Sequence, residues 1–404
     1  MLAVNFARSL RRLVPAVADI HVFAPPTDVT ETSYTPLCNL LLSTLCQGSV
    51  KGVHVYAEQA TIPISLEVQA LSRLTRIFQG RIASRTPFAQ LAYHSADTLQ
   101  ELNIDVGAED DWLSLVYGDT LVSVIFSRLT RLTLSVIDIP YATTWAAIDH
   151  VAPFPVLSTL RLFGGYPFDD DLLFRGNGKT MTNLCVPYSA LAKNALGRFN
   201  VFRRSGISRM DSVRIGRVQA EDNALIAERG DALIRQQIRR VLETTAALFI
   251  SRDTPEMLVF ASIAAAPSTH TLRHLEFDGL SFRVADIINI IAALPSLKSL
   301  ACMVGDPNTI AGVNPASLNV RYLRSTIYPL STSFRMLRVP HSVENSIEGV
   351  ASVAAHIAVL CPRFAFVDIP LGYRKPFGRE IAWAMVHKPF EQFSSSIRHL
   401  IFED

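Results

Sequence analysis

The stretch LTRLTL at 129–134 and its near copy LSTLRL at 157–162 share one pattern, with apolar residues at positions one, four and six. Between Leu99 and Ile215 the pattern occurs five times, starting at Leu99, Leu129, Leu157, Met181 and Met210. Recurrence at an interval of about 20–50 residues is typical of a solenoid. Further copies are therefore expected outside this stretch.

The pattern continues toward both ends of the chain. It starts at Val17, Val50 and Leu74 before this stretch, and at Thr244, Leu272, Leu297, Phe334, Phe364 and Ile397 after it. The copies at Leu74 and Thr244 are weak, since Gln79 and Thr244 take apolar positions. Starts lie 24–37 residues apart, which leaves room for a strand, a turn and a short helix. We predict an α/β solenoid of about 14 strand–helix units with a parallel concave sheet.

The segments between the copies have apolar residues three and four apart, which is the spacing of an amphipathic helix. Helices are predicted at 36–46, 88–96, 222–242, 284–294, 343–360 and 379–387. Pro155, Pro295 and Pro362 precede strands, and proline cannot continue a preceding helix. The prediction is a single solenoid over 1–404, with a capping helix over 1–16 and irregular repeats over 17–403.

Composition bounds the class of protein. Of 404 residues, 49% are hydrophobic and 18% charged, so much of the chain is expected to be buried. No apolar run approaches the roughly 18–20 residues of a membrane span, and a net charge of +2 provides no broad field for nucleic acid. Five cysteines without a framework spacing favour a reducing compartment. We expect a soluble, cytoplasmic protein, with the nucleus as an alternative location and a mitochondrial presequence as the weaker interpretation of the arginines before residue 18.

These copies resemble the leucine-rich-repeat family, in particular its long irregular members such as ribonuclease inhibitor and the repeat regions of F-box proteins. They are also similar to repeat proteins of fungi. The resemblance covers Val17 to Phe402, and it implies a concave sheet that binds a protein partner. The chain departs from the family at the ninth position, usually Asn or Cys, where it has residues such as Gly107, Ile137 and Gly165. It also leaves too little room before the repeats for an F-box.

Alternate residues of a strand face opposite sides of its sheet, so positions three, five and seven are expected to point away from the core. The polar clusters among them form the predicted partner-binding site: Glu101, Asn103, Asp105, Arg131, Arg161, Arg214, His274, Glu276 and Asp278. We predict a non-catalytic scaffold for protein–protein interaction. The alternatives are a substrate-recognition subunit of a ubiquitin ligase, with ligase components as partners, and an enzyme or nucleotide-binding protein.

An arginine-rich segment suggests a different partner. Its arginines are Arg198, Arg203, Arg204, Arg209, Arg214 and Arg217, with Asp211 as the one acid among them. Arginine at this density binds phosphate. Because only Phe199 and Phe202 are present as stacking partners, the sequence favours a protein partner over nucleic acid.

Catalytic and metal motifs are incomplete. Residues 178–180 (GKT) match the end of a phosphate-binding loop, but Leu173 stands where its first glycine is needed. His270 and His274 are four apart before a strand rather than on a helix, and His21 and His54 are expected to be adjacent across strands; neither pair makes a closed metal site. The cysteines Cys185 and Cys302 have no local base, and Cys302 takes a core position. We expect no catalytic residue, metal or cofactor.

Overall fold

The chain divides into two compact units, Met1–Ser208 and Arg209–Asp404. The computed structural model describes residues 9, 12, 18–23, 50–56, 73–79, 91–106, 115, 124–136, 152–164, 180–187, 210–216, 231–251, 271–282, 284–304, 331–339, 354, 357, 361 and 363–368. Within the expected capping helix, Ser9 and Arg12 are described and both are helical. The single solenoid over 1–404 stays a prediction.

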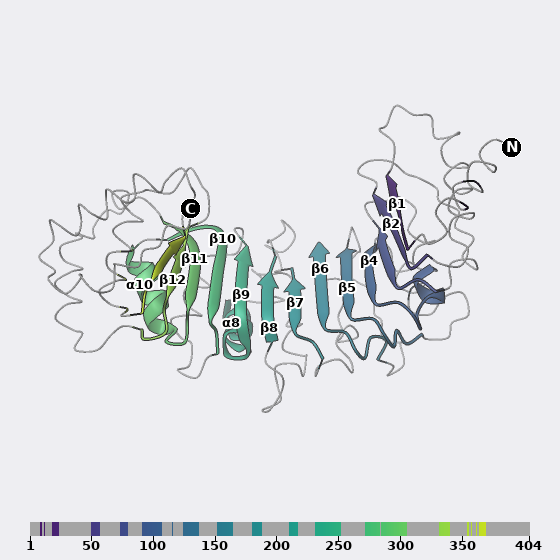
Figure 1. Ribbon diagram of the computed structural model, residues 1–404. Coiled ribbons are helices and arrows are strands. Elements are labelled where there is room, and N and C mark those ends of the chain that lie inside the picture. The colour runs from purple at the N-terminus through teal and green to yellow at the C-terminus, as the bar shows by residue number, and fades with distance from the viewer. Residues whose placement is uncertain are drawn as a thin grey trace, which may run out of the picture. The chain divides into compact units, whose positions relative to one another are not determined.

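Unit 1 is built on strands that run in one direction (Figure 1). They are β1 (Asp19–Phe23), β2 (Gly52–Tyr56), β3 (Arg76–Gln79), β4 (Glu101–Val106), β5 (Arg131–Val136), β6 (Thr159–Gly164) and β7 (Asn183–Val186). Each strand pairs in parallel with the next one along the chain. Pairing joins equivalent positions of the repeat, so that Leu132 lies opposite both Leu102 and Leu160.

Unit 2 repeats this arrangement and adds two described helices (Figure 1). Its strands are β8 (Met210–Ile215), β9 (Thr245–Ser251), β10 (His274–Phe282), β11 (Ser299–Val304), β12 (Met336–Arg338) and β13 (Phe366–Asp368). They too are parallel and paired in chain order. Helix α8 (Asp231–Thr244) precedes β9, and α10 (Val284–Ala293) precedes β11. Neither described helix is long and apolar enough to cross a membrane.

The prediction of a parallel-sheet solenoid is confirmed in each unit. Every described strand falls on a predicted copy of the pattern, including the weak copies, which form β3 and β9. The copy at Ile397 lies outside the described residues. The predicted helices at 284–294 and 222–242 correspond to α10 and, in part, to α8, and residues 91–94 of the predicted helix at 88–96 are helical. The remaining predicted helices lie outside the described residues or touch them at isolated positions, so the count of 14 strand–helix units stays a prediction.

The core lies on the side of the sheet that carries positions one, four and six. Leu129, Leu132 and Leu134 of one repeat have no exposed surface, and the equivalent residues Leu157 and Leu160 have none either. Helix α10 contributes four buried isoleucines to the core of unit 2: Ile287, Ile288, Ile290 and Ile291. Burial of one apolar column along consecutive strands supplies the main stabilisation of a repeat stack.

A second repeated interaction lies where the strands start. The carbonyl oxygen of the residue at position two accepts two backbone amides from the following repeat, as when Gln100 O takes the amides of Thr130 at 3.0 Å and Arg131 at 3.1 Å. Hydroxyl groups add to it, since the side chains of Thr130 and Ser158 donate to the carbonyls of Gln100 and Thr130 at 3.2 and 3.0 Å. Thr75 and Thr182 repeat the contact. This ladder holds neighbouring repeats in register.

The predicted direction of the side chains of β9 is wrong. In β9, the pattern placed Ala247 in the core and Leu248 on the outer face, but Leu248 is fully buried and opposite Val213 and Leu275, both of which are also buried. The register with β8 and β10 therefore places positions one, four and six of this copy at Thr245, Leu248 and Ile250, one residue later than the pattern implies. Phe249 takes the outward position instead.

The orientation of β9 can be tested by placing a carboxylate on either side of it. We expect Leu248→Asp to lower the free energy of unfolding by about 3–5 kcal/mol, because the charge would be buried without a partner. Ala247→Asp is expected to cost about 1 kcal/mol or less. Urea unfolding followed by circular dichroism measures both, and a larger loss for Ala247→Asp would contradict the observed orientation.

Candidate functional site

Two rows of side chains run across the strands of unit 1 on the side opposite the core. Position three supplies Asp19, Gly52, Arg76, Glu101, Arg131, Thr159 and Asn183, and position five supplies His21, His54, Phe78, Asn103, Thr133, Arg161 and Cys185. We call these two rows the open face of unit 1. Because pairing joins equivalent positions, residues far apart in sequence become direct neighbours in each row.

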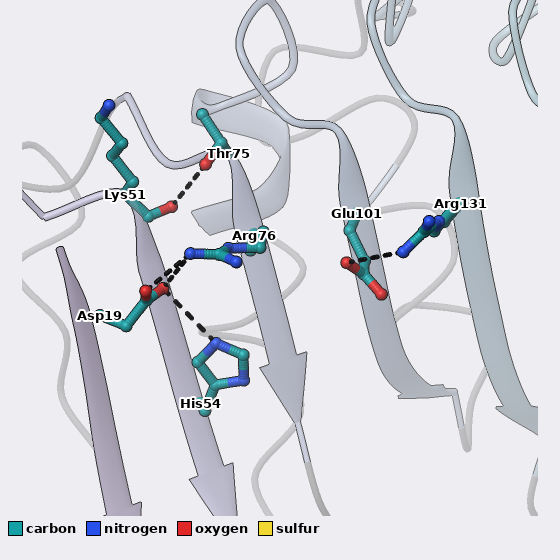
Figure 2. A network of polar contacts seen from close by, with 7 residues as sticks. All are labelled: Asp19, Lys51, His54, Thr75, Arg76, Glu101 and Arg131. Atoms are coloured by element: carbon teal, nitrogen blue, oxygen red, sulfur yellow. Dashed lines mark hydrogen bonds and ion pairs between the residues drawn. The ribbon is translucent and has the colours of Figure 1, made fainter.

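The first three strands carry an ion pair that passes over the middle strand (Figure 2). Arg76 Nη2 on β3 donates to both carboxylate oxygens of Asp19 on β1, at 2.7 and 2.6 Å. Neighbouring strands lie about 4.8 Å apart, so the two backbones are separated by roughly twice that distance. The long arginine side chain closes the gap above β2.

Gly52 makes this crossing possible. It lies in register between Asp19 and Arg76, and it has no side chain to occupy the space above β2. A Cβ atom at this position would overlap the Asp19 carboxylate and lie 3.3 Å from His54 Nε2. Any larger residue would therefore displace Asp19 from Arg76.

An aromatic stack runs beside the ion pair in the position-five row. The rings of His21 and His54 are parallel, with centroids 4.4 Å apart, and the Phe78 ring follows at 5.9 Å from His54. His54 Nε2 lies 3.7 Å from Asp19 Oδ1, and Figure 2 shows this contact beside the ion pair with Arg76. The predicted adjacency of His21 and His54 is confirmed.

The environment of His54 disfavours its charged form. Burial lowers its pKa below the ordinary value of 6.5, because a charged ring loses hydration there, and the nearby His21 and Arg76 lower the pKa further. The Asp19 carboxylate acts in the opposite direction and raises the pKa. The ring thus remains neutral at a lower pH than an exposed histidine.

The predicted residues on β4 to β6 have different surroundings. Arg131 lies opposite Glu101, with Nη1 at 3.8 Å from Oε2 and 65% of its side chain exposed. Asn103 is half-buried and Arg161 is exposed, in agreement with their predicted outward direction. Asp105 does not fit its predicted place on an accessible face, because it is only 4% exposed.

In unit 2, the position-five row begins with a cation–π contact. The guanidinium carbon of Arg214 lies 4.9 Å from the centre of the Phe249 ring, and Glu276 lies opposite Phe249 on the next strand. Further along the row, Arg338 Nε donates to Asp368 Oδ2 at 2.8 Å between β12 and β13. Arg214 and Glu276 thus lie on either side of Phe249, on the two strands next to β9.

The other two predicted residues of unit 2 lie on β10. His274 Nδ1 is 2.7 Å from Ser299 Oγ on β11, and burial, Lys298 and Arg273 lower the pKa of His274. Asp278 is exposed in a bulge, where the register between β10 and β11 shifts after Glu276. Gly279, with φ of 74°, supplies the left-handed backbone of this bulge.

The structure gives no support to the metal and thiol candidates within its described part. No group of three or more potential ligands gathers around a common point among these residues, and His270 lies outside them. Burial raises the pKa of the Cys302 and Cys361 thiols to about 12, so both remain protonated and unreactive. Cys185 is also buried, although its position predicted an outward side chain. The GKT segment falls outside the described residues except for Thr180, and so do the arginines of the basic segment other than Arg214.

Sequence reasoning missed Asp19, Gly52, Arg76 and Phe249. The first three share position three, and aligning that position alone shows opposite charges on either side of a glycine. Phe249 could not be recognised because the predicted phase of its strand was wrong. The chain matches no protein-family model, and it matches no curated protein.

Gly52 can be tested through its relation to Asp19. We expect Gly52→Ala to lower the free energy of unfolding by about 1 kcal/mol or less, because the added methyl group separates Asp19 from Arg76. Denaturant unfolding measures this loss. The control is the same substitution in an Asp19→Ala background, where the obstructed carboxylate is absent and the cost should be smaller. Equal costs in the two backgrounds would show that the glycine serves another purpose.

The charge balance at His54 can be tested by NMR titration. We expect Asp19→Asn to lower the pKa of His54 further, because it removes the group that raises this pKa and leaves Arg76 without its carboxylate. Asp97→Asn, at an exposed site outside the cluster, should leave the titration unchanged. A higher His54 pKa in Asp19→Asn would contradict the assignment.

The same lowered pKa predicts how stability depends on pH. Because His54 binds a proton less readily in the folded chain than in the unfolded chain, the free energy of unfolding should decrease as pH falls through 6.5 toward the folded pKa. His54→Gln should make this dependence shallower, with a remaining part from His274, whose pKa is shifted in the same direction. Urea unfolding at a series of pH values measures the slope, and an unchanged slope in His54→Gln would contradict the prediction.

Proposed function

We propose that this chain is an irregular leucine-rich-repeat protein that acts as a scaffold and binds a protein partner on its concave sheet, on the side opposite the buried core. The family assignment is supported by the spacing of the strands and by the apolar pattern that each of them follows. Leucine-rich-repeat proteins use the equivalent sheet face for binding, and the resemblance extends this use to the present chain.

The observation that carries the proposal is the ordered row of polar and aromatic side chains on neighbouring strands. Asp19 with Arg76 and Arg338 with Asp368 are joined by hydrogen bonds across strands, and Arg131 lies within 3.8 Å of Glu101. Side chains that are held in place before binding lose less conformational entropy in a complex. Arginine and aromatic residues, which dominate binding energy at many interfaces, occur in both units.

Arginine side chains offer a direct test of this surface. We expect the combined variant Arg161→Glu with Arg214→Glu to capture less partner than the unchanged chain, by a factor of at least about ten. Each substitution reverses an exposed charge on the sheet. Affinity capture from an extract of the native organism, followed by quantitative mass spectrometry, identifies the partner. Titration of the purified partner then measures the affinity of each variant.

Matched controls carry the same charge change elsewhere. Arg128 is exposed in the turn before β5, and Arg239 is exposed on α8, so neither lies on the strands that carry the proposed binding surface. Arg128→Glu with Arg239→Glu should bind the partner as the unchanged chain does. Equal binding by both double variants would place the interface elsewhere and contradict the proposal.

A further inference from the structure

Phe163 is an exposed aromatic residue at the end of β6. It lies in register with Ser135, which in turn lies opposite Asp105, so the neighbouring strands have polar residues at this position. Nevertheless 49% of Phe163 is exposed. Gly164 follows with φ of 83°, a left-handed conformation that favours glycine, and β6 ends there. The ring therefore sits at the second-to-last position of the strand, next to Gly164.

Arg161 accompanies Phe163 on the same side of the strand. Residues two apart in a strand share a face and lie about 7 Å from each other. The neighbours of Arg161 in register are Thr133 and Cys185, both uncharged, and strands β5, β6 and β7 contain no acidic residue. Arg131, on the adjoining strand, has 65% of its side chain exposed, although its Nη1 lies 3.8 Å from Glu101 Oε2 on β4. We call Arg131, Arg161 and Phe163 the β5–β6 patch.

We propose that the β5–β6 patch binds an acidic peptide segment of a partner protein, with a large apolar side chain of that segment packed against Phe163. This inference rests on the proposed function and specifies the chemistry of the partner. A guanidinium group pairs with a carboxylate through two hydrogen bonds, and an exposed ring beside it supplies apolar contact area. Glu101 offsets part of the charge of Arg131, but Arg161 has only uncharged neighbours in register, so the patch keeps a positive charge complementary to acidic side chains.

A peptide fits this patch better than a nucleic acid strand. Binding of single-stranded nucleic acid depends on successive aromatic rings on which consecutive bases stack. On β5 and β6 the outward positions around the arginines carry hydroxyl groups, from Thr133, Ser135 and Thr159, and a single ring. This composition suits carboxylates and peptide groups, which accept and donate hydrogen bonds beside one apolar contact.

The test is a selection of random dodecapeptides, displayed on phage, against the full chain. We expect enriched peptides to combine Asp or Glu with Phe, Trp, Leu or Met. Fluorescence polarisation with a labelled enriched peptide should show Kd values at least about tenfold higher for Phe163→Ala and for Arg161→Gln. Salt at about 0.5 M should weaken the binding, because it screens the arginine charges.

Ile125 provides a matched control. It is also 49% exposed, but it lies in the segment before β5 and not on the open face. Ile125→Ala should bind the peptide as tightly as the unchanged chain, and circular dichroism checks that each variant is folded.

Four results would overturn the inference. They are the absence of enriched peptides, enrichment of basic or uncharged peptides, full binding by Phe163→Ala and Arg161→Gln, and poly-uridine binding that depends on the same two residues. The proposed scaffold function would fail separately. If Phe163→Ala and Arg161→Gln still bind the captured partner while Arg214→Glu does not, the acidic-peptide inference is wrong and the scaffold function stands.

Discussion

Pairing of equivalent positions between consecutive strands is the constraint on which the rest of each unit depends. It turns the apolar positions of separate repeats into one buried column, such as Leu102, Leu132 and Leu160. The same pairing places Glu101, Arg131 and Thr159 side by side in one row on the open face. Carbonyl oxygens that each accept two amides from the following repeat hold this register at the strand starts. Core and surface are therefore two results of one geometry.

The strands could be predicted from the sequence because a recurring six-residue pattern with apolar positions at one, four and six fits few structures other than a repeated strand with one buried face. Its phase was ambiguous in one strand. TAALFIS, the sequence of β9, has apolar residues in both phases, so the local pattern does not decide which of them face the core, and the pairing with β8 and β10 does. Asp105 shows a similar limit, because its burial depends on the atoms around it and not on its place in the alternation.

The candidate site was harder to predict than the fold. Arg131, Arg161 and Arg214 were recognisable as outward residues because their strands were correctly placed. The Asp19–Arg76 pair was missed because it joins strands that are not adjacent, and because the residue that permits it is a glycine, which a search for apolar or charged positions ignores. Phe163 was missed for a related reason. The predicted site consists of polar residues at outward positions, and Phe163 is apolar.

Repeat stacks are usually coupled between nearest neighbours only, so a strand at the end of the stack is held by one other strand. The contact over Gly52 changes this coupling for β1, the first described strand of unit 1. Asp19 ties it to Arg76, two strands away, in addition to its backbone bonds with β2. Local opening of β1 must then break a contact with β3 as well as its bonds to β2. One missing side chain thus extends the contacts of β1 from one neighbouring repeat to two.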